Sequence, residues 1–198
     1  MIQLRADRRE FEPAFTRVFG SVAAGTEAAL SLELIDSPVG PLLLGANDHA
    51  LRLLEFTRPG GFELQLQKVQ RRFGAVNREP HRWLDAARTQ LAEYFAGQRR
   101  DFDLPLEYPG SDFQRRVWST LLAIPYGQTW SYLDVALRIG DAGATRAVGT
   151  TNGRNEIAIV IPCHRVINAD GALGGYGGGL WRKRVLLDLE CGQGSLAL

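Results

Sequence analysis

Residues 159–167, Ile-Val-Ile-Pro-Cys-His-Arg-Val-Ile, constrain the fold most strongly, because polar and reactive side chains interrupt an apolar run there. Such a run predicts a buried strand that ends at Cys163 and His164. Neighbouring side chains of an extended chain point to opposite sides, so these two cannot pair directly unless the backbone turns or a water bridges them. Pro162 fixes its own φ and keeps Ile161 extended. We therefore expect the backbone to bend at Cys163 itself.

A Cys-His dipeptide has two interpretations. In the first, Cys163 is a nucleophile that reacts as thiolate, and its ordinary pKa of about 8.5 is lowered by a neighbouring cation or hydrogen-bond donor. In the second, Cys163 is a buried structural cysteine and His164 a surface residue, which is the commoner case for an arbitrary dipeptide. The motifs in the rest of the chain favour the nucleophile.

These motifs follow one another through the C-terminal half in a fixed order. They are Phe-Gln-Arg-Arg-Val-Trp at 113–118, Ile-Pro-Tyr-Gly at 124–127, Ser-Tyr at 131–132, Arg-Ala-Val-Gly at 146–149, Asn155, Ile-Pro-Cys-His-Arg-Val at 161–166, Gly-Ala-Leu-Gly-Gly-Tyr at 171–176, Leu186 and Glu190. In this order and spacing they closely resemble the motifs of the O6-alkylguanine-DNA alkyltransferases, which repair alkylated guanine.

The resemblance implies an α+β fold in two domains. The N-terminal domain, 28–108, would be a ribonuclease-H-like sheet-and-helix domain, and the C-terminal domain, 109–192, a mainly helical winged-helix or helix-turn-helix domain. Residues 193–198 would form a tail. Residues 1–27 would be an extension whose segment Phe-Thr-Arg-Val-Phe-Gly resembles the end of an AraC-type helix-turn-helix. We interpret this extension as a remnant of such a domain or as a docking helix.

Hydrophobic periodicity places the elements of the N-terminal domain. His49 and His81 are interpreted as turn and helix-start residues, and no metal site is expected. The predicted elements are an antiparallel meander of strands at 30–36, 42–45 and 50–56, helices at 61–73 and 80–96, and a further strand at 102–106.

Two capping-box patterns begin helices in the C-terminal domain. Ser111 with Gln114 opens the first, and Ser131 with Asp134 opens the second. The second helix and a small-residue helix over 142–151 predict a helix-turn-helix. Small residues allow a close approach to a groove or to another helix. A long cation such as the arginine at position 146 would be poorly placed in a core, so the groove is favoured.

The resemblance also implies how DNA is bound. A stacked base cannot present its O6 substituent to a thiol, so the nucleotide must be flipped. The arginine that matches Arg146 takes the place of the flipped nucleotide, and the tyrosine that matches Tyr132 contacts the guanine. Gln114 and Ala147 are expected to contact DNA as well. From the residues alone, Tyr132 would be a core residue.

The catalytic residues are carried over in the same way. The family's Cys-His-Glu arrangement maps onto Cys163, His164 and Glu190, with a water between the thiol and the imidazole. Glu190 follows apolar residues on one face of a helix expected over 180–191. Asn155 would stabilise the link between the recognition helix and the active-site segment, although alone it would be a turn residue.

The guanine pocket is expected beside a glycine-rich loop at 171–179. Without the Lys-Ser/Thr of a P-loop, this loop is not interpreted as a phosphate site. Tyr176 and Gly177 would line the pocket. Some relatives carry serine at the position of Gly177. The carbonyl groups of Val166 and Cys163 would accept the guanine amino group. The basic cluster Trp-Arg-Lys-Arg at 181–184 is interpreted as a solvated face.

Composition limits the remaining possibilities. The net charge of +1 excludes a polybasic DNA-coating protein, so DNA must bind to a local patch. Two cysteines make no disulfide framework, and no stretch resembles a membrane span or signal peptide. We expect a cytoplasmic monomer that acts on double-stranded DNA containing O6-alkylguanine and needs no cofactor, since the damaged base donates the alkyl group. The alternatives are a non-catalytic alkylguanine sensor and a cysteine hydrolase.

Overall fold

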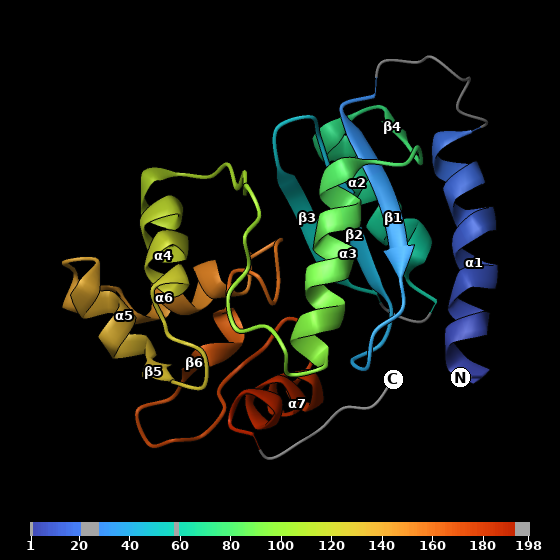
Figure 1. Cartoon of the computed structure of the whole chain (residues 1–198). Coiled ribbons are helices and arrows are strands. Elements are labelled where there is room, and N and C mark those ends of the chain that lie inside the picture. Colours follow the sequence, from blue (N-terminus) through green and yellow to red (C-terminus); the bar gives the residue numbers. More distant parts are fainter. Residues whose placement is uncertain (1, 21–27, 58–59, 193–198) are drawn as a thin grey trace. The chain divides into compact units, whose positions relative to one another are not determined.

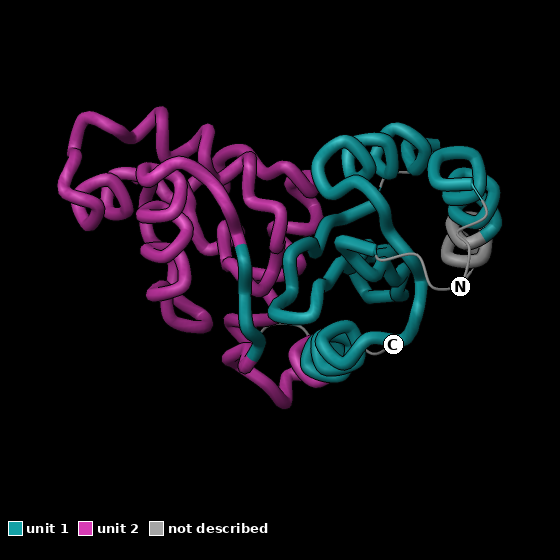
Figure 2. The backbone as a smooth tube through the Cα atoms, turned by 90° about the horizontal axis from the view of Figure 1, so that it is seen from above, with its two compact units in different colours: residues 1–92, 104–107 teal, residues 93–103, 108–198 magenta. Residues whose placement is uncertain are grey.

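The computed structural model describes residues 2–20, 28–57 and 60–192, and side chains within its first helix from residue 9 onward. The chain divides into two compact units (Figure 2). Unit 1 comprises residues 1–92 with 104–107, and unit 2 comprises residues 93–103 with 108–198. Within the described residues, no helix has both the length and the apolar character needed to cross a membrane.

Unit 1 is built on a sheet of four strands in the order β3-β2-β1-β4. The predicted antiparallel meander is present as β1 (Leu30–Ile35), β2 (Leu42–Ala46) and β3 (Leu51–Phe56). β4 (Val76–Asn77) adds a short parallel edge beside β1, which the sequence pattern did not predict.

The strand predicted over 102–106 is wrong. Only Leu106 forms an isolated bridge, to Leu51. The neighbouring carbonyl of Pro105 accepts the Leu51 N–H at 2.9 Å, so the segment touches the sheet edge at one point. Two prolines within eight residues, at 105 and 109, limit further pairing because proline has no N–H to donate.

Helices cover both faces of this sheet. α3 (Arg82–Phe95) crosses one face, and α2 (Phe62–Phe73) lies on the other, with α1 (Ile2–Phe19) beside it (Figure 1). Phe11 and Phe15 of α1 are buried in the core that the sheet and α2 form. α1 is therefore an integral layer of unit 1.

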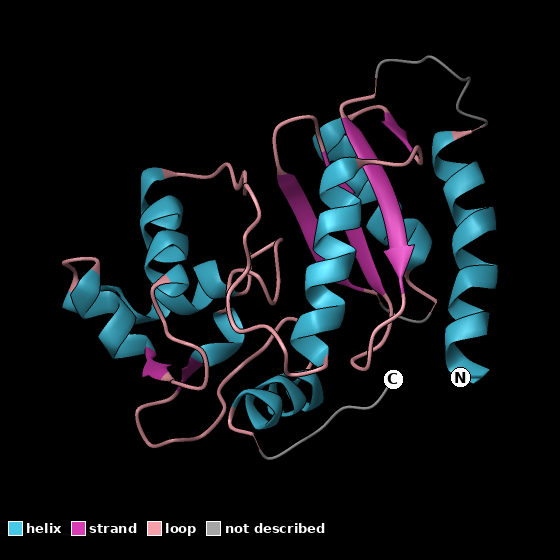
Figure 3. Ribbon diagram, viewed as in Figure 1, coloured by secondary structure: helices cyan, strands magenta, loops and turns pink. Residues whose placement is uncertain are grey.

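Unit 2 is mainly helical (Figure 3). Both predicted capping boxes are confirmed: the side chains of Ser111 and Ser131 accept from the N–H groups three residues on, and the side chains of Gln114 and Asp134 accept from the cap N–H groups. The helices are α4 (Asp112–Leu122), α5 (Tyr132–Arg138), α6 (Thr145–Asn152) and α7 (Leu180–Glu190).

The helix predicted over 142–151 begins differently. Asp141 caps a 3-10 turn, Ala142–Ala144, by accepting from the Gly143 N–H, and regular α-helix starts only at Thr145. α5 and α6 pack together as expected for a helix-turn-helix, since their residues are in contact. The indole N–H of Trp118 in α4 donates to the Thr151 carbonyl and fixes the end of α6.

The segment that precedes the thiol is not a strand, so this expectation is wrong. The Ile161 N–H bonds to the Ile157 carbonyl and closes a turn, within which Ile159 takes a φ of 70°. Cys163–Arg165 then form a 3-10 helix, so the bend at Cys163 is confirmed. β6 (Val166–Ile167) follows and pairs in parallel with β5 (Trp130–Ser131).

Candidate active site

Cys163 lies against a pocket of about 190 Å³ within unit 2. Its side chain is almost wholly buried, with 6% of the residue exposed. The pocket draws on the start of α5, the end of α6 and the glycine-rich loop. It is lined by Tyr132, Gly149, Asn152, Gly153, Cys163, Gly175, Tyr176 and Gly177. Four of these residues are glycines, so backbone approaches the pocket closely and leaves it open for a planar ligand.

Asn155 binds the sulfur directly. Its Nδ2 donates to Cys163 Sγ at 3.1 Å and to the Ile161 carbonyl at 2.8 Å, while its Oδ1 accepts the Ile157 N–H at 3.0 Å. These three bonds leave one orientation of the amide, with the N–H₂ toward the thiol. Burial raises the pKa of the Cys163 thiol, and the hydrogen bond from Asn155 and the charge of Lys183 partly oppose that rise. The thiol is therefore protonated at rest and needs a base.

His164 is fully buried next to the thiol but does not bond to it. Its Nε2 lies 2.8 Å from Glu190 Oε1, and its Nδ1 has no hydrogen-bond partner among the described residues. Burial lowers the pKa of His164 below its ordinary 6.5, against the opposing effect of Glu190, so the ring is neutral at pH 7. A neutral imidazole with one unoccupied nitrogen can accept a proton.

Glu190 is held by five hydrogen bonds. Besides His164, Arg165 donates through Nε at 2.8 Å and Nη2 at 3.0 Å, Tyr94 OH donates at 2.7 Å, and the Gly127 N–H donates at 3.2 Å. Burial by itself would raise the pKa of Glu190, but the bonds and charges of His164 and Arg165 outweigh it and hold the pKa at about 2. Glu190 therefore remains a carboxylate that orients the imidazole.

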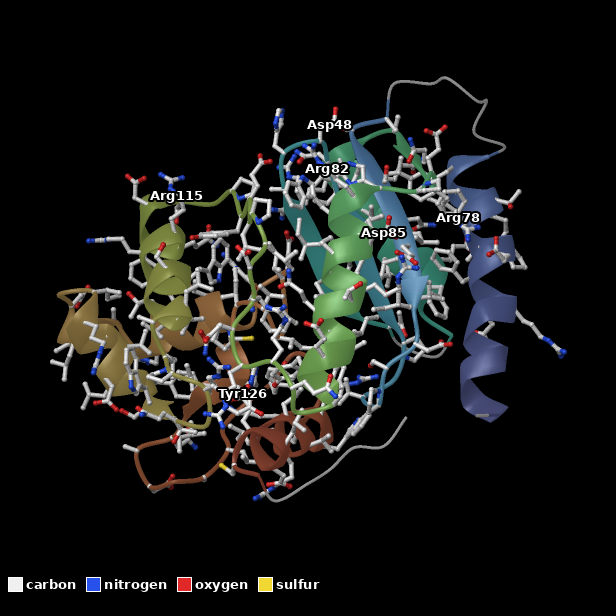
Figure 4. All side chains as sticks on the ribbon, viewed as in Figure 1. Asp48, Arg78, Arg82, Asp85, Arg115 and Tyr126 are labelled. Carbon is white, nitrogen blue, oxygen red and sulfur yellow. The ribbon has the colours of Figure 1, made fainter. Side chains whose placement is uncertain are left out.

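Two of these partners were missed by sequence reasoning. Arg165 is buried, also donates to the Ile124 carbonyl at 2.6 Å, and lies over the ring of Tyr126, which is labelled in Figure 4. Arg165 lies inside an apolar motif, which indicates that it is buried. A buried arginine requires an anion, so this position could have predicted an acidic partner. Tyr94 lies in the last turn of α3 among apolar residues such as Leu91, so the sequence gave no reason to predict a hydrogen bond from its hydroxyl to Glu190.

Lys183 contradicts the interpretation of the basic cluster as a solvated face. Its neighbours Trp181 and Arg184 are exposed, but Lys183 is fully buried. Its Nζ donates to the carbonyl of Val166 at 2.6 Å and to that of Leu173. In α7, position 183 of the cluster faces the interior. The sequence pattern did not indicate which of the three consecutive basic residues would be buried.

The predicted DNA-contacting residues occupy different places. Arg146 and Ala147 are exposed on α6, and the Arg146 guanidinium makes no hydrogen bond or ion pair within the described part of the chain. Tyr132 lines the pocket and its hydroxyl donates to the Gly175 carbonyl at 3.4 Å, so it is not a core residue. Gln114 sits at the start of α4, where its side chain is engaged in the capping box.

Comparison with known proteins identifies the family. Residues 30–108 match the family model of the 6-O-methylguanine DNA methyltransferase ribonuclease-like domain, and residues 112–192 match the model of its DNA binding domain. The chain belongs to this family. Its fold is accordingly α+β, with a sheet-and-helix part followed by a mainly helical part.

Several relatives within the family are similar in sequence to this chain over most of their length. The methylated-DNA–protein-cysteine methyltransferase of Mycobacterium bovis is 47% identical over an alignment of 169 positions, and the match covers 79% of this chain and 89% of the relative. That of Methanosarcina barkeri is 44% identical over 158 residues, covering 80% and 95%. The crystal structure of Mycobacterium tuberculosis OGT in complex with DNA superposes with a TM-score of 0.70 at 44% identity, covering 82% of this chain and 94% of that one.

Proposed function

We propose that the protein repairs O6-alkylguanine in double-stranded DNA by transferring the alkyl group to Cys163. The observation that carries this proposal is the thiol at the wall of a pocket of about 190 Å³, bonded to the Asn155 amide and next to a neutral imidazole backed by a carboxylate. The names of the relatives, methylated-DNA–protein-cysteine methyltransferases, support the same reaction.

In the proposed step the thiol proton moves through a water to Nδ1 of His164, the ring nitrogen without a protein partner. Glu190 then stabilises the imidazolium that forms. The thiolate attacks the alkyl carbon, an S–C bond forms, and the C–O6 bond breaks with its electron pair on guanine. The guanine anion takes up one proton, and the His164 imidazolium releases the thiol proton through water, so that atoms and charge balance over the whole reaction. A thioether carbon offers water no good leaving group, so Cys163 is consumed after one turnover and no cofactor is required.

The proposed substrate reaches the pocket by nucleotide flipping. The Arg146 guanidinium is planar and exposed and has no hydrogen bond or ion pair among the described residues, so it can occupy the vacated position in the stack. Ala147 and Gln114 are proposed to contact the duplex beside it, and Tyr132 to contact the flipped base. α6 carries alanine at position 147 and glycine at position 149, and the 3-10 turn before it is Ala-Gly-Ala, which suits close approach to the minor groove.

Within the pocket, the carbonyl of Val166 is proposed to accept the guanine amino group. Lys183 already donates to this oxygen, and a carbonyl oxygen can accept two hydrogen bonds. Tyr176 and Gly177 would form the wall beside O6. A Cβ at Gly177 would meet only the Gly153 carbonyl, at 3.8 Å, so a small side chain would fit there. The protein is proposed to act as a monomer in the cytoplasm, where thiols stay reduced.

The experiment mixes the protein with excess duplex that contains one O6-methylguanine and measures the intact mass, followed by peptide mapping. One added methyl group on Cys163 with stoichiometric loss of the lesion is expected, and the Cys163→Ser variant should gain none. Tight lesion binding with no mass change would indicate the alternative sensor function. Loss of more than one lesion per protein would refute single-turnover chemistry.

A further inference from the structure

Lys183 is a buried cation for which the described residues provide no acidic partner. The residue is 0% exposed, and its Nζ donates to two backbone carbonyl groups, those of Val166 and Leu173. Carbonyl dipoles satisfy the N–H donors but carry no net charge. Burial of an ammonium without an opposite charge is costly, so a function or a counter-charge should offset it.

Glu190 is not that counter-charge. It lies seven residues further along α7, about 10 Å along the helix axis. Its carboxylate is engaged by His164, Tyr94 and the bidentate guanidinium of Arg165. The positive charge of Arg165 already balances Glu190, which leaves the ammonium of Lys183 uncompensated.

Within the part of the chain that the structure describes, the ionisable groups coupled electrostatically to Lys183 are Cys163 and His164. His164 is neutral or cationic and cannot act as a counter-ion. Burial lowers the pKa of Lys183 to about 8, and a negative charge on Cys163 acts in the opposite sense. In return, the Lys183 ammonium lowers the pKa of the Cys163 thiol and also that of His164. A thiolate at Cys163 is thus the anion that can match this cation.

The two hydrogen bonds of Lys183 join two segments that each supply residues to the pocket. Val166 begins β6, three residues after the thiol, and Leu173 lies in the glycine-rich loop three residues before Tyr176. One ammonium therefore links the segment that carries the nucleophile to the loop that supplies Gly175, Tyr176 and Gly177 to the pocket.

We infer that Lys183 is a positioning residue whose buried positive charge stabilises the Cys163 thiolate and whose hydrogen bonds hold these two segments of the pocket together. This rests on the proposed function, in which Cys163 is the nucleophile. Transfer of the alkyl group forms the S–C bond and replaces the anion by a neutral thioether. The spent protein can no longer form this thiolate, so the titration of Lys183 loses its coupling to an anion at Cys163.

A first test compares variants in a Cys191→Ser background, so that one thiol remains. The rates of iodoacetamide labelling and of alkyl transfer are followed as a function of pH. Lys183→Met should slow both by about tenfold at neutral pH, which corresponds to about one pKa unit, and the deficit should narrow as the pH rises. Lys183→Arg should keep the wild-type profile. Arg184→Met removes an exposed charge from the same helix and should change neither rate.

A purely structural role would lower the rates of Lys183→Met by one factor at every pH, and this result would overturn the inference. If Lys183→Arg shifted the pH–rate profile by the same amount as Lys183→Met, the inference would also be overturned, because the positive charge would then not determine the reactivity of Cys163.

A second test uses the protein with Lys183 intact and does not depend on a variant that folds poorly. The chain contains two lysines, Lys68 and Lys183, so isotope-labelled lysine gives two side-chain signals by NMR. The Lys183 signal should titrate at lower pH after Cys163 has been alkylated, while the exposed Lys68 should not change. An unchanged Lys183 midpoint refutes the inference. Failure of lesion DNA to methylate Cys163 would instead refute the proposed function, and iodoacetamide-labelled protein would still decide the role of Lys183.

Discussion

Replacement of Tyr94 by phenylalanine should destabilise unit 2 by a measurable and specific amount. The Tyr94 hydroxyl is fully buried and donates to Glu190 Oε1 at 2.7 Å. Burial raises the pKa of Tyr94 well above 10, so the hydroxyl stays a donor through the whole neutral range. A hydrogen bond to a charged group contributes about 1.5–3 kcal/mol. Glu190 keeps its other donors in the variant, so we expect the lower half of that range, about 1.5–2 kcal/mol.

Urea unfolding monitored by tryptophan fluorescence measures this change, because three of the four tryptophans belong to unit 2. Tyr108→Phe is the matched control. The Tyr108 hydroxyl lies 3.3 Å from Ser119 Oγ in an exposed, uncharged pair, and its loss should cost at most about 0.5 kcal/mol. Alkyl transfer should persist in Tyr94→Phe, since Arg165 still fixes the carboxylate.

Equal stability of Tyr94→Phe and Tyr108→Phe would refute the argument that the bond to Glu190 contributes as a charge-assisted bond. A loss of transfer activity without a loss of stability would show that Tyr94 acts in the chemistry itself.

Three further predictions follow from the structure. Arg146→Ala should slow transfer from duplex DNA but not from the free base O6-benzylguanine, which needs no flipping; equal slowing of both in single-turnover assays would contradict the proposed role. Because the pKa of Glu190 is about 2 when folded against 4.5 ordinarily, its carboxylate stabilises the fold above pH 4.5, and about 3 kcal/mol should be lost as the pH falls from 4.5 towards 2. His164, with its pKa lowered by burial, adds to this acid loss below about pH 6.5; unfolding midpoints in urea that do not change between neutral and acid pH would refute both. Phe11→Ala should cost about 3–5 kcal/mol in urea unfolding if α1 is part of the unit 1 core, whereas a negligible change would mean that α1 is dispensable.

Local patterns in the sequence predicted much of the secondary structure. The capping boxes at Ser111 and Ser131 depend on hydrogen bonds between residues three apart, so they could be read directly and are present. The meander of unit 1 followed from the alternation of apolar residues in β1. The bend at Cys163 followed from the limits that Pro162 places on its neighbours.

Patterns failed where long-range contacts compete with local preference. Residues 159–161 are β-branched and apolar and favour a strand, but the chain closes a turn there and places Ile159 in the left-handed region at φ 70°. The segment at 102–106 has a strand-like pattern, yet contacts the sheet only through the bridge at Leu106.

The sequence by itself determined the order of the motifs, the family resemblance and the identity of the candidate nucleophile, because these are carried by residues close together in the chain. Only the tertiary structure decided the electrostatics of the site. Glu190 accepts hydrogen bonds from Tyr94, 96 positions earlier in the chain, and from Arg165, 25 positions earlier. Lys183 is buried although its basic neighbour Arg184 is exposed. The charge state of a buried group depends on what surrounds it in space, and no local pattern records which distant donors will meet.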